Sequence, residues 1–161
     1  MRARGFGFAF GLGALAALAA GPSAQAGYAR QAATKAYALK AVQFYHGAGF
    51  AAARRAFTRQ RQAWRGGPAD FGLHLVALGR DREVWADTAF PTMNGLNADD
   101  LSDPHGRSLG ETVFDALAKS PRGAAVRLPA GSATRDVAAG SEGYCLPADA
   151  RNVICAWSES E

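Results

Sequence analysis

Side chains that could bind a metal gather between residues 90 and 107. The segment FPTMNGLNADDLSDPHGR holds three Asp, two Asn and one His. An EF-hand calcium loop needs oxygen ligands at alternating positions and a Glu at position twelve. Counted from Asp99, position three is Leu101 and position twelve is Gly110, and a count from Asn97 fails in the same way. The EF-hand template is therefore excluded.

A turn-rich loop explains this segment better. Asp103-Pro104-His105-Gly106 has Pro and Gly at the second and fourth positions of a β-turn. Asn94, Gly95 and Asn97 are also common turn residues. A zinc site would need a second His or Cys close to His105 in the sequence, and there is none. We predict a structured loop without a metal ion.

One enzymatic motif matches the sequence. Residues 106–110 read GRSLG, which fits the G-x-S-x-G nucleophile elbow of α/β-hydrolases. That motif needs a buried strand before the Ser and a His after it, whereas Ser108 follows a polar turn and all three His precede it. The adjacent carboxylates Asp99 and Asp100 lie in the same turn-rich segment, which is weak support for acid–base catalysis. We predict a protein that is not an enzyme and that has no cofactor.

The first 26 residues are organised like a secretory signal peptide. Two Arg precede an uncharged apolar run over residues 5–20, and Ala24-Gln25-Ala26 has the small-x-small pattern of a cleavage site. The run is shorter than the about 20 residues that span a membrane, and Gly21-Pro22 ends it. We predict that residues 1–26 are removed and that residues 27–161 form one exported domain; an uncleaved anchor is the alternative. The abundance of Ala, Gly and Arg is compatible with a bacterial source, so we expect a periplasmic or secreted protein.

Export determines how the two cysteines are interpreted. Cys145 and Cys155 are the only cysteines of the chain, and an even pair in an oxidising compartment is usually a disulfide. Their C-x9-C spacing suits two adjacent antiparallel strands joined by a turn. We therefore predict a disulfide between Cys145 and Cys155.

The formal net charge of +4 is small. It falls further when the two Arg of the predicted signal peptide are removed, and so mild a charge does not indicate binding to nucleic acid or to an anionic membrane. Five Arg nevertheless cluster between residues 54 and 65. They could form a basic docking face, but such residues more often mark the solvated side of an amphipathic helix.

Hydrophobic periodicity predicts a helical first part. Residues 28–64 read as helix, and Gly47 and Gly49 split it into a longer and a shorter segment. The apolar residues predicted to lie near one helical face are Leu39, Val42, Phe50, Phe57 and Trp64.

Strands follow the helices. Residues 73–78 and 84–90 read as a hairpin, and residues 108–120 as a helix with Ser108 as N-cap and Glu111 completing a capping box. Short strands are expected near residues 124–128, 134–139, 143–146 and 152–157. This order predicts an α+β fold with an antiparallel sheet.

The order of these elements resembles the single Cache domain family. The resemblance extends over about residues 30–158 and rests on a hairpin that reads LHLVALGRDREVWADTAFP, on a closing VICAW strand, and on short motif positions between them. Those positions are Pro91, Met93, Gly95, Asn97, Leu101, Asp103 and Gly106. Where that family often has an aromatic residue on the first strand of the hairpin, this chain has His74 and Val76, and Asp87 stands where a His is common.

The resemblance implies a PAS-like fold, in which a long N-terminal helix or two helices pack on an antiparallel sheet. It also implies a ligand pocket on one face of the sheet and a role as an extracellular sensor of small molecules, often carboxylates. Because no signalling domain follows in this chain, sensing would have to act through a separate membrane or periplasmic protein partner. We expect no nucleic-acid partner.

Strand alternation then suggests ligand-binding residues. We expect His74 and Val76 to share one strand face and Trp85 and Asp87 to share a face of the next strand. In this hypothesis Trp85 and Met93 form apolar walls while His74 and Asp87 make polar contacts to a carboxylate, amino acid or amine. Simpler interpretations place Trp85 in the core, Asp87 as a strand-end cap and His74 in solvent. A protein-binding module without a small ligand is the alternative function.

Overall fold

The structure is a computed structural model that describes residues 22–66, 72–102, 106–128 and 141–158, with side chains from residue 27 onward. Its helices are α1 (Pro22–Ala48), α2 (Phe50–Arg59), the 3₁₀ turns η1 (Arg61–Trp64) and η2 (Pro91–Met93), and α3 (Leu109–Lys119). Its strands are β1 (His74–Gly79), β2 (Val84–Asp87), β3 (Ala124–Arg127), β4 (Glu142–Pro147) and β5 (Asn152–Ser158). None of the described helices combines the length and the apolar character needed to cross a membrane.

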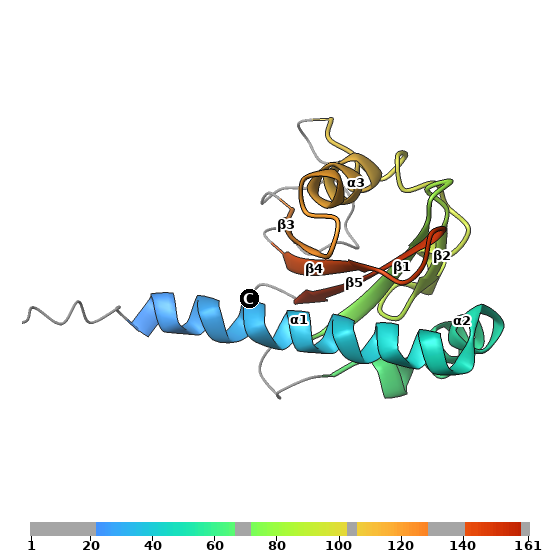
Figure 1. Cartoon of the computed structure of the whole chain (residues 1–161), viewed down its shortest axis with the longest axis horizontal. Coiled ribbons are helices and arrows are strands. Elements are labelled where there is room, and N and C mark those ends of the chain that lie inside the picture. Colours follow the sequence, from blue (N-terminus) through green and yellow to red (C-terminus); the bar gives the residue numbers. More distant parts are fainter. Residues whose placement is uncertain (1–21, 67–71, 103–105, 129–140, 159–161) are drawn as a thin grey trace, which may run out of the picture.

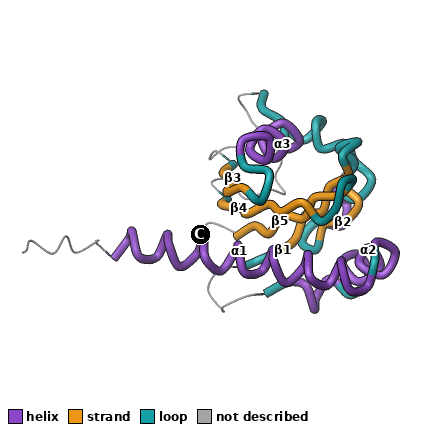
Figure 2. Tube along the Cα trace, viewed as in Figure 1, coloured by secondary structure: helices purple, strands orange, loops and turns teal. Residues whose placement is uncertain are grey.

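The strands form one antiparallel sheet between two helical layers. Its order is β2-β1-β5-β4-β3, so the last strand of the chain lies in the centre. Figure 1 shows α1 running along one face of this sheet while α3 lies over the β3–β4 part of the other, and Figure 2 shows the strands as the layer between them. The predicted α+β fold with a long N-terminal helix is confirmed. The strand predicted near residues 134–139 lies outside the described residues.

The predicted break between the first two helices is confirmed. Gly49 has φ of +79°, a left-handed conformation that glycine adopts without the steric penalty of other residues. It separates α1 from α2 and allows the chain to change direction. The predicted signal peptide stays a prediction, because residues 1–21 lie outside the described part and residues 22–26 form the first residues of α1.

The buried face of α1 differs from the predicted one. Val42 is buried as predicted, but Leu39 and Phe50 are each 41% exposed. The residues of α1 that pack most closely on the sheet are small: Ala38 and Ala41 are fully buried. Each lies one position before a residue of the predicted face, Leu39 or Val42. Small side chains let a helix lie close to a sheet, and Phe50 falls beyond the Gly49 break, where the helical phase starts again.

A hydrogen-bonded cluster holds the end of α1 on the β4–β5 turn. The Tyr45 hydroxyl donates to the Asp149 carboxylate, and Asn152 Nδ2 donates to the Tyr45 hydroxyl over 3.0 Å. Asp149 Oδ1 also accepts from the backbone N–H groups of Arg151 and Asn152 at 2.7 Å each. These bonds give the Asp149 carboxylate its hydrogen-bond donors at the turn, and they fix the position of α1 on the sheet.

The sheet divides the hydrophobic core into two parts. The helix-side core lies between the sheet and α1 and α2, and includes Phe57, Trp64 and Trp85. The α3-side core lies on the opposite face and includes Val113 and Trp157. Because both faces are covered, β1 is buried along its whole length, which explains its continuous apolar run.

The predicted disulfide links two central residues of the β4–β5 hairpin. Cys145 and Cys155 are direct partners in the register, with Cα atoms 4.0 Å apart, and form a disulfide. Both are fully buried in the α3-side core. The cross-link therefore joins strands that a short turn already brings together.

We expect exported protein to contain no free thiol before reduction, measured by intact mass after alkylation. Replacing both Cys145 and Cys155 by Ala should lower the free energy of unfolding by about 2–3 kcal/mol, because the unfolded chain regains the freedom of a short loop. Two alkylated cysteines in the unreduced sample would contradict the disulfide. The reduced wild type lacks the cross-link but keeps both sulfur atoms. Its chemical denaturation therefore measures the effect of the cross-link alone.

Candidate functional site

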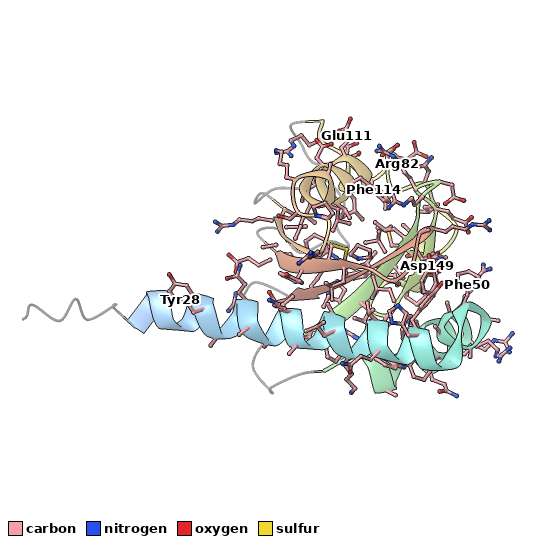
Figure 3. All side chains as sticks on the ribbon, viewed as in Figure 1. Tyr28, Phe50, Arg82, Glu111, Phe114 and Asp149 are labelled. Carbon is pink, nitrogen blue, oxygen red and sulfur yellow. A yellow bond between two sulfur atoms is a disulfide. The ribbon has the colours of Figure 1, made fainter. Side chains whose placement is uncertain are left out.

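The loop after β2 is a fixed structural element over its described residues. Arg82 Nη1 lies 2.6 Å from Asp99 Oδ1, and the Ser108 hydroxyl donates to the same oxygen over 3.1 Å. Ser108 and Glu111 form the predicted capping box at the start of α3. Figure 3 shows Arg82, Glu111 and Phe114 gathered at this end of the molecule. The loop is thus held to the start of α3 by hydrogen bonds and to the β1–β2 turn by an ion pair.

The same loop brings together no evident metal site. Within the described ranges, no group of three His, Cys, Asp or Glu side chains could hold a metal ion. Residues 103–105, which include the predicted turn and His105, lie outside those ranges. Of the two described loop carboxylates, Asp99 and Asp100, Asp99 is engaged by Arg82 and Ser108.

A β-bulge separates two of the predicted ligand-binding residues. Ala77 pairs with Ala86, but the next residue of β1 pairs with Val84, so Trp85 is the extra residue between them. Trp85 therefore points into the helix-side core, whereas Asp87 pairs with Val76 of the opposite face. The prediction that Trp85 and Asp87 share a face is wrong, because it assumed unbroken alternation.

Trp85 is surrounded by aromatic rings. Its ring is stacked on Phe57 with centroids 5.9 Å apart and lies edge-on to Phe50 at 5.2 Å. Only 4% of Trp85 is exposed. The structure thus places Trp85 where the simpler interpretation did, in the core beneath α1 and α2.

The other four predicted residues lie on the α3-side face of the sheet. Val76 and Met93 belong to the α3-side core. His74 lies two positions before Val76 in β1, so the alternation of the strand places both on the same face. The ring of His74 meets Phe90 edge-on at 6.0 Å. All four predicted residues are buried, including Asp87 at 1% exposure.

Asp87 is held as the cap of its strand. Its Oδ1 accepts from the backbone N–H groups of Ala89 and Phe90, each at 2.8 Å. Its own backbone N–H donates to Asn94 Oδ1 over 2.6 Å. These bonds turn the chain sharply after β2 and place Phe90 and Met93 against the α3-side core.

Trp157 is a candidate residue that the sequence interpretation missed. It is the direct partner of His74 across β1 and β5, so both side chains lie on the same face. A Cβ atom at Gly143 would lie 2.5 Å from Trp157 Cε3, so the indole occupies space that only glycine leaves open. His74 Nδ1 and Trp157 Nε1 are both buried and have no hydrogen-bond partner in the described structure.

Two unpartnered polar atoms on opposed residues are unusual. A buried donor or acceptor without a partner costs about 1–3 kcal/mol, and most such groups in folded proteins are satisfied. Trp85 Nε1 is the third buried atom of this kind among the described side chains, but it lies on the opposite face. The His74–Trp157 pair is therefore the strongest candidate for a polar ligand contact.

The site is closed in this structure. Open hollows of about 470 Å³ and 530 Å³ lie elsewhere on the described surface. The first is lined by Tyr28 and edge strand β3, and the second by Tyr45, Phe50 and the two neighbouring turns. A ligand would reach His74 only if covering side chains, such as the half-buried Phe90, moved aside.

Burial keeps His74 neutral. Removal from water lowers the pKa of its imidazole from 6.5 to about 4. Within this net shift, a backbone hydrogen bond involving Gly72 acts to raise the pKa, and the positive charge of Arg65 acts to lower it. At neutral pH His74 thus has one ring nitrogen that donates and one that accepts.

Comparisons with known proteins identify the fold. The structure matches a "periplasmic sensor domain of chemotaxis protein" with a TM-score of 0.58 and 17% identity, over 88% of this chain and 100% of that one. It also matches a Cache chemosensory domain, from work titled as the structural basis of its carboxylic acid recognition, with a TM-score of 0.51 and 14% identity, over 86% and 93% of the two chains. No family model and no curated protein matches the sequence. The chain therefore has the PAS-like fold of single Cache domains, as its motifs predicted.

We expect the stability of the fold to fall as pH is lowered from about 6.5 to about 4. In that window the imidazole of His74 is protonated in the unfolded chain but not in the folded one, so protons favour unfolding; above pH 6.5 both forms are neutral. The full loss is about 3 kcal/mol for a shift of this size. Chemical denaturation at a series of pH values measures it.

His74→Gln should flatten this part of the stability profile. His46→Gln, which removes an exposed imidazole, is the matched control and should leave the slope due to His74 in place. An unchanged slope in His74→Gln would show that other groups carry the pH dependence.

Proposed function

We propose that this chain is an exported, non-enzymatic sensory domain that binds a small molecule on the α3-side face of its sheet. Its location in the periplasm or outside the cell and its action through a separate protein partner are part of this proposal. The fold supports it, because both similar structures are described as sensor domains. The observation that carries it is the opposed pair of buried, unpartnered atoms on His74 and Trp157.

The proposed site comprises His74, Val76, Asp87 and Met93, with Trp157 added by the structure. Val76 and Met93 supply apolar contacts, and Asp87 holds the turn that carries Met93 and Phe90 into place. His74 and Trp157 supply the polar contacts. Trp85 is left out, because the bulge directs it to the other face.

The chemistry of the pair narrows the ligand class. An indole N–H only donates, so a ligand must offer an acceptor oxygen to Trp157. The neutral imidazole of His74 can donate to a second oxygen or accept from a ligand N–H. Small carboxylates and amino acids meet these demands better than simple amines do, and one similar structure is described as recognising a carboxylic acid.

Binding would be coupled to movement of the covering residues. Both polar atoms are buried, so the segment that carries Phe90 has to open and close around a ligand. The same loop is linked to the start of α3 through the hydrogen bond from the Ser108 hydroxyl to Asp99. A change at the site can therefore reach a partner that contacts α3 or the loop.

A thermal-shift screen against small carboxylates, amino acids and amines tests the proposal. A ligand at one hundred times its dissociation constant should stabilise the fold by about 2.7 kcal/mol, which raises Tm by several degrees. Trp157→Phe, which removes the N–H but keeps a ring, should weaken binding about tenfold, since one hydrogen bond is worth about 1–1.5 kcal/mol.

Trp85→Phe is the matched control, because it makes the same chemical change to an equally buried and unpartnered indole on the other face. It should leave the affinity unchanged. Equal weakening by both variants would contradict the proposed face, and a flat response across the panel would favour the module that binds a protein without a small ligand.

A further inference from the structure

The charged residues of this chain are segregated along the sequence. All 14 Asp and Glu residues lie at or beyond Asp70. Between residues 27 and 66 there are eight Lys and Arg and no carboxylate. The small net charge of +4 is therefore the difference between a strongly basic part and an acidic part of the molecule.

The fold converts this segregation into a charged face. Residues 27–66 form α1, α2 and η1, which we call the helical layer, and this layer covers one side of the sheet (Figure 1). The carboxylates on described residues belong to the strands, their turns, the loop after β2, and α3. The helical layer itself thus contributes only positive charges. Glu142 and Asp149 lie where the sheet and its turn meet α1, and the loop after β2 and α3 carry further carboxylates.

The most concentrated part of the helical layer is an arginine surface formed by Arg54, Arg55, Arg59 and Arg61. The arginines of α2 lie on the side of the helix opposite its buried residues. The side chains of these four arginines have no ion-pair partner among the described residues. Their guanidinium groups are therefore available to pair with phosphate or carboxylate groups from outside.

We propose that the helical layer binds the surface of an anionic phospholipid membrane. A layer with cations along its length and no carboxylate attracts lipid phosphates over its whole area, at about a fivefold gain in binding per cation near the surface. The acidic groups of the opposite side are repelled from the same surface, so the two effects together orient the domain. The α3-side face then points away from the membrane.

The layer fits a membrane better than it fits an acidic protein. Protein interfaces depend on a central cluster of buried aromatic residues. The two exposed aromatic residues labelled in Figure 3, Tyr28 and Phe50, lie at opposite ends of α1 and form no such cluster. Lys35 and Lys40 lie over the rings of Tyr144 and Trp64 at 5.4 Å each, which holds their charges along the flank of the layer.

This inference revises the expectation drawn from net charge. A mild total charge did not indicate an anionic membrane, but the field near a surface depends on the nearest charges within about 8–10 Å at physiological salt. At that range the charges of the helical layer itself dominate, and residues 27–66 contribute only cations. The inference stands independently of a small-molecule ligand.

Vesicle co-sedimentation of the protein purified after export, without the predicted signal peptide, tests the inference. We expect binding to vesicles of equal parts phosphatidylglycerol and phosphatidylcholine, weakening as NaCl is raised, and no binding to pure phosphatidylcholine. The triple variant R54E/R55E/R59E should lower the partition coefficient by at least about a hundredfold. R54K/R55K/R59K, which keeps the charges, should retain binding within about tenfold.

The matched control is R107E/K119E/R122E, which changes the net charge equally beside α3, on the other side of the sheet. It should retain binding to the anionic vesicles. Equal losses in the two triple variants would show that net charge, not an oriented surface, governs binding, and would overturn the inference. Absence of binding by the wild type at low salt would overturn it too and assign the layer to an acidic protein. Thermal denaturation verifies that each variant is folded.

Discussion

The position of β5 between β1 and β4 is the constraint on which the rest of the structure depends. This strand is buried on both faces, because α1 covers one side of the sheet while α3 and the loop after β2 together cover the other. Its alternation sends Cys155 and Trp157 to the α3-side core. The same register sets Cys155 opposite Cys145 and Trp157 opposite His74. One strand thus fixes both the disulfide and the proposed ligand contact.

What the sequence predicted correctly depends on neighbours along the chain. The helix break at Gly49, the capping box of Ser108 and Glu111, and the Cys145–Cys155 hairpin each involve residues within about ten positions, where turn and cap chemistry decides the outcome. The PAS-like fold was predicted by the order of such elements. These features are local, so a single sequence was sufficient.

The errors have long-range causes. Trp85 was placed on the wrong face because a β-bulge depends on how β2 pairs with β1, which alternation alone does not reveal. Trp157 was missed because its pairing with His74 joins the first and last strands. Leu39 was predicted to be buried, but close packing of α1 on the sheet selected the small residues Ala38 and Ala41 instead. Each outcome is decided by tertiary contacts.

Unsatisfied atoms alone do not identify a site. Trp85 Nε1 is as buried and as unpartnered as Trp157 Nε1, yet Trp85 lies among aromatic rings and, as the extra residue of the bulge, has no direct partner in β1. What distinguishes Trp157 is that His74, another residue with an unpaired nitrogen, faces it from the next strand. Leu at position 74 would remove one buried nitrogen that has no hydrogen-bond partner. It would also remove the loss of stability at low pH that comes from a buried neutral imidazole. A fold that keeps two unpartnered buried nitrogens on neighbouring residues carries a local instability, which a ligand with two polar atoms would relieve.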